Sequence, residues 1–518
     1  MSLDTPVKIG LETHVQLNST TKMFCGCKNP IHFEAAVFKI LNSKSSKASS
    51  ESKMSLKLKD KAFHNMKAEA FPNTITCPIC LGLPGSKPNA NRRAFELAAK
   101  VSIALGCDIA KETYFSRKTY FYPDMAKNFQ ITQYEIPLAK DGTVEMESES
   151  GKKQIRIRRI HMEEDPAKLV HVGGLGGDGK HVLMDYNRSG IPLIEIVTEP
   201  DFKSPKEARL YINKLATVLE YLGVYDSSSE ASIKTDANIS IAGGERVEVK
   251  NISGAKEVER ALAFEYMRQK NVVARGGKIV QETRAWDDVS GTTKALRKKE
   301  TEEEYGYIFE PDLPKLEVSE SFKKNISSQI PELPDAKRKR LIKQYKIAEK
   351  TAESIVSSID LANLFESAAK TVKVEIAAAW ISERLMKTLN YNSITWKTSG
   401  LKQEWIIDLL KMFESGKYSD DVAERILWKM IDDRLPPLEA AKRHGLSEID
   451  RSLNLEKTIS GILAKNAKAV EDYKNGGEKS LNFLIGQLMR ETKGAVDAKN
   501  AREKIIKMVK KFPLFVKT

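Results

Sequence analysis

The change of sequence pattern near residue 330 constrains the fold most. Before it, apolar and polar residues alternate in stretches such as IRIRRI (155–160) and ANISIAG (237–243), which predicts strands. Amphipathic segments that predict helices lie among these strands, at 91–106, 204–223 and 255–270. Beyond Pro331 and Pro334 the pattern is helical with short connectors. We therefore predict an α+β protein, in which a mixed domain built on antiparallel strands precedes all-α parts.

Three domains fit this pattern. We expect the mixed domain over 1–328, a helical domain over 329–445 and a small helical tail domain over 446–518, with the last break near RHGLSEID. A chain of 518 residues is long enough for several separate cores. The Ser/Lys-rich tract at 41–61 is expected to be a surface insertion that joins no core.

The charge is strongly basic. The chain has 84 Lys and Arg against 70 Asp and Glu, a net charge of +14. Such an excess favours a polyanionic partner such as RNA, although a lysine-rich surface that serves solubility is the alternative. Because no apolar run approaches a membrane span and the first residues, MSLDTPVK, lack a signal-peptide segment, we expect a cytoplasmic protein with no membrane partner.

Four of the five cysteines form two close pairs, Cys25 with Cys27 and Cys77 with Cys80. Two such pairs separated by a loop are typical of a tetrahedral structural zinc site. The alternative is four ordinary buried thiols. Cys107, alone at the end of a predicted helix, is expected to be a packing residue.

A glycine-rich segment, HVGGLGGDGKH (171–181), partly matches a phosphate-binding loop. Such a loop requires Ser or Thr after the lysine and then a helix, whereas here His181 and the strand-like VLMDY follow. A glycine-rich hairpin is therefore the better interpretation, and a nucleotide site is expected elsewhere.

Several carboxylates stand where a charge is unfavourable. Glu195 lies inside the apolar run IPLIEIV and needs a partner or a metal. The strand IGLETHVQL (9–17) places Glu12 and His14 on one face, which by itself is typical of a solvated strand surface. HMEEDPAK (161–168) adds three acidic residues. Magnesium prefers oxygen ligands, but each carboxylate taken singly is more often a member of an ion pair.

An ordered set of motifs runs through the chain: GLETHVQL, RKTYFYPDMAKNFQITQ, RIHMEEDPAK, DYNRSGIPLIEIVTEPD, KTDANIS, VKNISG, QETRAWD, FEPDL, IPELPD and YKNGGEKSLNFLIGQLMRETKG. With these motifs the chain resembles the GatB/GatE family of tRNA-dependent amidotransferase subunits. The resemblance implies a cradle-like catalytic domain, a helical domain and a YqeY-like tail domain that grips tRNA. Because the core runs straight into the helical half, with no inserted domain, the GatB type is favoured over the archaeal GatE type.

The resemblance also implies an activity. A GatB protein is an ATP-dependent carbon–nitrogen ligase that uses Mg²⁺ to phosphorylate the side-chain carboxylate of misacylated Glu-tRNA(Gln) or Asp-tRNA(Asn). Ammonia made from glutamine by the partner GatA then displaces the phosphate, within a complex that includes GatC. The choice between the two tRNAs stays open. The rival interpretations are a non-catalytic, zinc-bearing tRNA-binding scaffold and a self-contained glutamine amidase, for which no convincing nucleophile constellation is present.

Site residues follow from the resemblance, position by position. The expected magnesium ligands and catalytic residues are Glu12, His14, Glu164 and Glu195. Candidates for positioning the nucleotide or the tRNA end are Lys118, Tyr120, Asn187, Arg188, Lys250 and Asn251. One departure is Gly306, which stands where many relatives have Arg, so any role of that side chain is in doubt.

Overall fold

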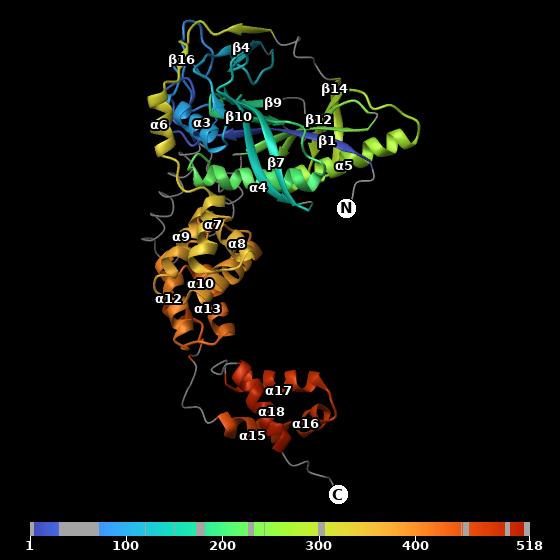
Figure 1. Cartoon of the computed structure of the whole chain (residues 1–518), viewed down its shortest axis with the longest axis vertical. Coiled ribbons are helices and arrows are strands. Elements are labelled where there is room, and N and C mark those ends of the chain that lie inside the picture. Colours follow the sequence, from blue (N-terminus) through green and yellow to red (C-terminus); the bar gives the residue numbers. More distant parts are fainter. Residues whose placement is uncertain are drawn as a thin grey trace. The chain divides into compact units, whose positions relative to one another are not determined.

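The chain divides into two compact units, one up to Leu333 and one from Pro334 (Figure 1). The computed structural model describes residues 5–30, 72–119, 121–149, 151–171, 182–225, 233–242, 244–298, 306–446, 448, 455–492 and 498–511. The Ser/Lys-rich tract at 41–61, most of the glycine-rich segment and the apolar end of the chain lie outside these residues.

One large sheet forms the centre of the first unit. Its twelve strands among the described residues are β1 (Val7–Gln16), β2 (Asp108–Ile109), β4 (Ser116–Thr119), β5 (Phe129–Thr132), β6 (Ala139–Ser148), β7 (Gly151–Glu164), β10 (Pro192–Thr198), β11 (Ile233–Ile241), β12 (Val247–Ser253), β13 (Glu282–Asp287), β14 (Thr292–Lys298) and β15 (Tyr307–Phe309). The order is β14-β13-β12-β11-β1-β10-β7-β5-β4-β15, and β6 pairs with both β7 and β2. Within it, β12 and β13 run parallel and the other pairs antiparallel. The predicted α+β class is confirmed.

Two small antiparallel pairs lie outside this sheet. One joins β3 (Glu112–Thr113) to β16 (Leu316–Glu317), and the other joins β8 (Lys168–His171) to β9 (Val182–Asp185). Because β8 and β9 flank the glycine-rich segment and pair with each other, the segment connects a hairpin. The preference for a hairpin over a phosphate-binding loop is confirmed.

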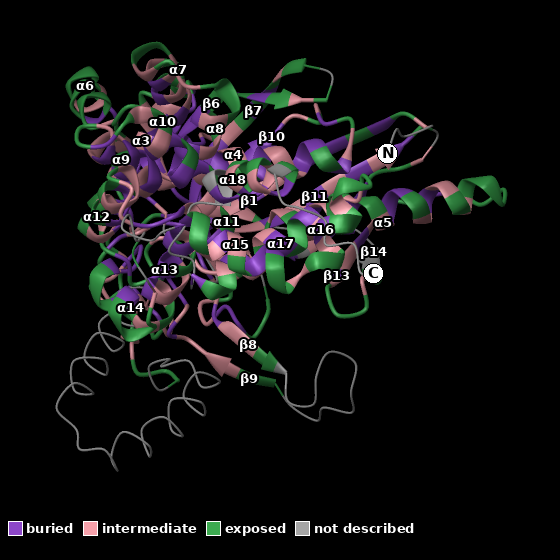
Figure 2. Cartoon of the chain, turned by 90° about the horizontal axis from the view of Figure 1, so that it is seen from below, coloured by how far each residue is buried: buried purple, intermediate pink, exposed green. Residues whose placement is uncertain are grey.

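Helices cover the apolar side of the sheet: α3 (Arg92–Ala104), α4 (Pro205–Tyr221) and α5 (Ala255–Ala274), followed by α6 (Glu320–Ser328). The first three match the predicted helices to within a few residues. α4 begins after Ser204, whose hydroxyl accepts a hydrogen bond from the Glu207 amide at 3.2 Å, and it is followed by Gly223 with a φ of 68°. Figure 2 shows buried stretches along α5 and an exposed last turn.

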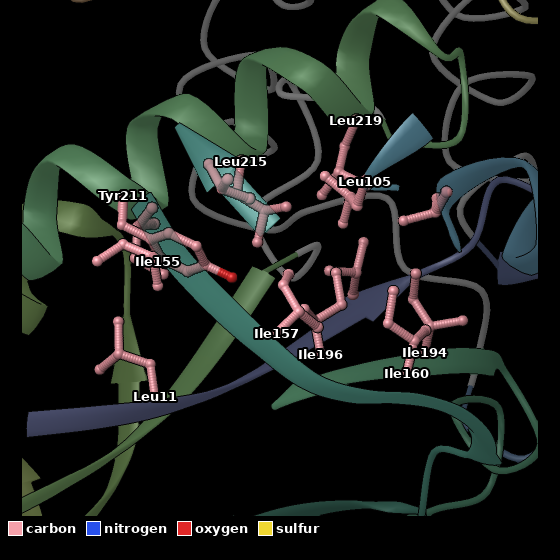
Figure 3. Packing of buried hydrophobic residues seen from close by; sticks show 14 of the residues in the cluster. Leu11, Leu105, Ile155, Ile157, Ile160, Ile194, Ile196, Tyr211, Leu215 and Leu219 are labelled. Carbon is pink, nitrogen blue, oxygen red and sulfur yellow. The ribbon is translucent and has the colours of Figure 1, made fainter. Parts of the chain in front are cut away.

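Packing between α4 and the sheet supplies much of the core. Tyr211, Leu215 and Leu219 point from one side of α4 onto the sheet (Figure 3). Beneath them lie the apolar side chains of the central strands, Leu11, Ile155, Ile157, Ile160, Ile194 and Ile196. Burying these side chains stabilises one face of the sheet and leaves the opposite face of the same strands available for polar groups.

The second unit is helical. Its elements are α7 (Pro334–Tyr345), α8 (Glu349–Val356), α9 (Ile359–Ala368), α10 (Val374–Ala379), the π-helical η2 (Trp380–Leu385), α11 (Met386–Tyr391), α12 (Gln403–Glu414), α13 (Asp420–Asp433), α14 (Pro437–Arg443), α15 (Leu455–Lys465), α16 (Ala467–Lys474), α17 (Glu478–Glu491) and α18 (Ala498–Lys511). One hydrophobic core involves α7 to α14, and a separate core involves α15 to α18. None of the described helices combines the length and apolar character that crossing a bilayer requires.

Leu215→Ala should destabilise the first unit by about 2–5 kcal/mol, because it leaves a cavity between α4 and the sheet. Native-state hydrogen exchange of peptides from α4 and β10 measures this loss directly and separately from the helical unit. Asn213→Ala, at an exposed position of the same helix, should change the free energy of opening by less than about 0.5 kcal/mol. Equal exchange in the two variants would contradict the packing described here.

Candidate active site and zinc centre

Five neighbouring strands carry polar side chains on the face turned away from α4, which we call the polar face. Its members are Glu12 and His14 from β1, His161 and Glu163 from β7, Glu195 from β10, Lys234, Asp236 and Asn238 from β11, and Glu248 and Lys250 from β12. The strand register aligns four of them across the sheet. Lys234 lies opposite His14, His14 opposite Glu195, and Glu195 opposite His161.

His14, Glu163 and Glu195 converge into a three-residue cluster. One ligand atom from each lies within 4.8 Å of the others. His14 Nε2 is 3.2 Å from Glu195 Oε2 and 3.6 Å from Glu163 Oε1, and His161 Nε2 is 3.4 Å from Glu195 Oε2. The side chain of His14 is 23% exposed, whereas those of Glu163 and Glu195 are 8% and 12% exposed. The cluster is therefore nearly buried but can be reached from solvent through His14.

The charges in this cluster hold one another. Burial alone would raise the pKa of Glu195, but the charges and hydrogen bonds of His161 and His14 outweigh burial and hold it well below the usual range. Burial would lower the pKa of His14, yet the hydrogen bond to Glu195 and the nearby carboxylates raise it to about 10. Burial and the charge of Glu195 raise the pKa of Glu163, against the opposing charges of His14, His161 and Lys118. A proton between two carboxylates occupies the position that a divalent cation could take.

Glu163, rather than the expected Glu164, joins the cluster. Glu164 points to the opposite side of the sheet, where its Oε1 accepts a hydrogen bond from the Ile131 amide at 3.0 Å and pairs with the Lys127 ammonium. It is 3% exposed. The structure thus gives Glu164 a place in the packing of β5 against β7, apart from His14 and Glu195.

A β-bulge explains this exchange. The pairing of β7 with β10 shifts by one residue at Arg158. Before the shift, odd-numbered residues such as Ile157 face the core; after it, even-numbered residues from Ile160 onward do so. Strict alternation through Ile157 would have placed Glu164 on the polar face. The extra residue places Glu163 there instead.

Glu12 lies beside the cluster and belongs to a second acidic group. Its Oε1 accepts a hydrogen bond from Asn238 Nδ2 at 3.0 Å, and it lies opposite Asp236 in the strand register. Burial raises the pKa of Glu12 to about 7, with further contributions from the neighbouring carboxylates. Lys250, a predicted nucleotide contact, lies 3.3 Å from Asp236 and 3.5 Å from Glu248. Its ammonium therefore offsets this acidic group.

The other predicted contacts are spread out. Lys118 is near enough to Glu163 for its charge to act on that carboxyl. Asn187 and Arg188 hold the backbone: Asn187 Oδ1 accepts from the Ile75 amide at 2.7 Å, and Arg188 donates to the carbonyls of residues 166 and 167 at 2.8 and 2.7 Å. Tyr120 and the side chain of Asn251 lie outside the described part of the chain.

The four paired cysteines meet in one place. The Sγ of Cys80 lies 3.5 Å from that of Cys25 and 3.8 Å from those of Cys27 and Cys77. A tetrahedral zinc ion with bonds of about 2.3 Å separates its sulfur ligands by about 3.8 Å, so the cluster fits zinc. Cys107 is buried elsewhere, in the hydrophobic core, which agrees with a packing role.

A buried lysine supports the cysteine cluster. Lys22 is 0% exposed, and its Nζ donates to the carbonyls of Ile75 and Tyr186 at 2.9 and 3.2 Å and to Cys80 Sγ at 3.5 Å. The hydrogen bond with Cys25, and then the charge of Lys22, lower the pKa of Cys80 to about 4 although burial opposes them. A thiolate held in this way is prepared for a metal ion.

The donor groups of the polar-face cluster also fit a metal. Two nearly buried carboxylates with an imidazole suit a divalent cation, and carboxylate oxygens suit magnesium in particular. Magnesium keeps several of its waters, which leaves positions for phosphate oxygens. His14 could bind the cation or orient Glu195 by its hydrogen bond.

Comparison with known families gives this arrangement a context. The model of the GatB/GatE catalytic domain matches residues 7–50 and 49–324, and that of the GatB domain matches residues 363–509. The chain belongs to the GatB/GatE family. The predicted resemblance is confirmed, and the polar face lies entirely within the part that matches the GatB/GatE catalytic domain.

Close relatives in the GatB/GatE family carry one name, that of the B subunit of an aspartyl/glutamyl-tRNA(Asn/Gln) amidotransferase. The chain is 45% identical to the protein of this name from Methanosarcina barkeri, over 97% of its own length and 98% of that protein. Those from Methanococcoides burtonii and Haloquadratum walsbyi are 42% and 40% identical, with 95% or more of each chain covered. These names favour the GatB type over the GatE type.

Some residues of the site were not predicted from the sequence. Glu163 and His161 stand in the motif HMEED, and the doubled arginine of IRIRRI is the only local sign of the bulge that selects them. Lys22 has no sequence signature, because a lysine in a loop is normally exposed. Its burial follows from the meeting of three distant segments of this GatB/GatE chain.

Glu163→Gln should weaken binding of a divalent cation about tenfold or more, because it removes one of the two charged donors of the cluster. Titration with Mn²⁺, followed by electron paramagnetic resonance, measures the affinity. Glu164→Gln is the matched control: it should leave Mn²⁺ affinity unchanged and lower stability, because it weakens the partner of Lys127. The reverse result for this pair would return Glu164 to the site.

Cys80→Ser should reduce zinc from about one ion per chain to nearly none, because it removes a thiolate ligand. Elemental analysis of the purified protein measures the content. Cys107→Ser provides the control, since it removes a thiol from the core but not from the cluster. Full zinc content in Cys80→Ser would exclude a four-thiolate site.

Proposed function

We propose that the chain is the GatB component of a glutamyl-tRNA(Gln)/aspartyl-tRNA(Asn) amidotransferase and carries its ATP-dependent ligase activity. The observation that supports this most is the convergence of His14, Glu163 and Glu195 on the polar face. A cluster of nearly buried carboxylates around an imidazole is unfavourable unless it binds a cation or a proton, and phosphoryl transfer needs a cation at its centre. The proposed substrates are ATP and a tRNA misacylated with glutamate or aspartate.

Two steps make the amide. An oxygen of the side-chain carboxylate attacks the γ-phosphorus of ATP, and the bond from that phosphorus to the bridging oxygen breaks, which yields an acyl phosphate and ADP. Ammonia then attacks the acyl carbon, phosphate leaves with the bonding electron pair, and the nitrogen loses a proton. The first step is needed because a carboxylate has no good leaving group. Mg²⁺, when bound, neutralises phosphate charge and aligns the γ-phosphate.

The residues of the chain have distinct parts in this scheme. Glu163 and Glu195 would hold the cation, and the hydrogen bonds from His14 and His161 would orient Glu195. Lys118, whose charge acts on Glu163, is the predicted phosphate contact that lies nearest this cluster. Glu12 would stay a candidate ligand through water, because it lies on the same face two residues before His14.

Partners and further cofactors extend this proposal. Ammonia would come from the glutaminase GatA, with GatC completing the complex. Zinc at the four cysteines would be structural, since it supports the segments around Ile75 and Tyr186 rather than a reacting group. On α18, Ala501, Ile505 and Val509 are buried while Arg502, Lys507 and Lys510 are exposed, so the tail domain offers a basic surface to tRNA. A cytoplasmic location agrees with such a substrate.

The test offers the assembled complex Glu-tRNA(Gln) or Asp-tRNA(Asn), Mg-ATP and ammonium chloride. We expect tRNA-dependent phosphate release and amide formation, reduced at least about a hundredfold in Glu195→Ala and His14→Ala because charge stabilisation at the phosphoryl group is lost. Product amide and released phosphate are measured together. The two tRNAs, compared at equal concentration, show which substrate is used.

Glu145→Ala and His444→Ala serve as controls, since both residues are matched in type and lie away from the polar face. Binding of tRNA without any turnover in the complete complex would favour the non-catalytic scaffold. Undiminished rates in Glu195→Ala would remove the cluster from the reaction.

A further inference from the structure

A recess opens on the polar face at the N-terminal end of β1, beyond Glu12. It holds about 610 Å³ of empty space, open water included, which is within the range of small-molecule sites. Its lining residues are Lys8, Gly10, Leu11, Glu12, Arg158, Val197, Thr198, Pro200, Asn238, Ile239, Ser240 and Arg246. Glu12 borders both the recess and the candidate metal cluster, so the two are continuous.

Gly10 forms the floor of the recess. A glycine in a central strand weakens it, and it often marks a place where another group approaches the backbone closely. Neither conformation nor packing requires glycine here: its φ is not positive, and an added Cβ would lie 3.6 Å from the nearest atom, in Pro200, which is ordinary contact. The missing side chain instead leaves space between Lys8 and Glu12, which are its neighbours on the same face.

The walls combine features that suit a nucleoside. Val197 and Pro200 supply apolar surface for a flat base, while Asn238 and Ser240 can exchange hydrogen bonds with a base edge or a ribose. Asn238 donates to Glu12, and its Oδ1 has no hydrogen-bond donor among the described residues. An unsatisfied buried acceptor beside a recess is a place where a ligand donor can bind.

Planar cations line the same recess. The guanidinium of Arg158 donates two hydrogen bonds to the carboxylate of Glu199, at 2.8 and 3.0 Å, and this pairing fixes its plane. Arg246 is exposed at the opposite side, and Lys8 is exposed on β1. Guanidinium groups stack on aromatic faces and also pair with phosphate, so both parts of a nucleotide find partners here.

The distance along β1 connects this recess to the reaction. Gly10 and His14 are four residues apart, or about 13 Å along an extended strand. This matches the separation of a nucleoside from its own γ-phosphate in an extended triphosphate. A nucleotide lying along β1 would thus place its terminal phosphate at the cluster of His14, Glu163 and Glu195 when its nucleoside occupies the recess.

We propose that the recess over Gly10 binds the nucleoside of the nucleoside triphosphate, whose phosphates run along β1 toward His14. The inference rests on the proposed function, because that function supplies ATP as the substrate. It differs from the contacts predicted from sequence, since Asn187 and Arg188 are engaged in holding the backbone elsewhere.

Gly10→Val tests this proposal, because valine suits a strand and fills the recess. The full chain is titrated with Mg-ATP and, separately, with magnesium tripolyphosphate, which has no nucleoside. We expect Mg-ATP to bind about tenfold or more weakly in Gly10→Val, and tripolyphosphate to bind as in the wild type. Arg246→Ala should also weaken Mg-ATP binding, and Lys140→Ala, which removes an exposed cation from β6, should not.

Folding is checked by zinc content and by hydrogen exchange of β1, and Arg246→Ala supplies an answer even where Gly10→Val unfolds. An equal loss of tripolyphosphate binding, or unchanged Mg-ATP binding in both variants, would overturn the proposal. Weakened tRNA binding with unchanged ATP binding would assign the recess to the tRNA end instead. Absence of Mg-ATP binding to the wild-type chain would refute the proposed function, whereas the other outcomes concern the recess alone.

Discussion

The buried carboxylate of Glu195 is the constraint on which the rest of the site depends. It stands in the middle of a sheet, on a strand whose neighbouring residues are apolar, and it remains charged because two imidazoles flank it. Each imidazole comes from an adjacent strand, on either side of β10. A sheet with these strands in another order would leave the charge without partners, at a cost of several kcal/mol.

The opposite face of the same strands makes this arrangement possible. Ile194 and Ile196 flank Glu195 in sequence and pack under α4, so one strand carries both the core and the site. The apolar face binds β10 firmly to its neighbours, which keeps the polar side chains close although their charges resist burial. Rigid strands of this kind hold functional groups more accurately than loops do.

The cysteine centre stabilises a region adjoining the polar face. Lys22 and Asn187 connect the cysteine segments to the residues that lead into β10, by hydrogen bonds to Tyr186 and Ile75. Gln16, at the end of β1, donates to Asp165 at 2.8 Å just after β7. The strands that carry His14, Glu163 and Glu195 are thus joined by polar contacts at the end of the sheet nearest the cysteines. A metal that orders one segment would therefore also support the geometry of the cluster.

Much of this could be predicted from the sequence, because it depends on local pattern. The α+β class, the three helices of the first unit and the pairing of Glu12 with His14 on one strand face all follow from periodicity. Cys25, Cys27, Cys77 and Cys80 were identified by their spacing. The tertiary structure alone decided between Glu163 and Glu164, because a bulge at one arginine reverses which side chains face the site and no residue pattern states where pairing will slip. It also decided that Lys22 is buried and that Gly10 lies in a recess, since both depend on segments far apart in the chain that only folding brings together.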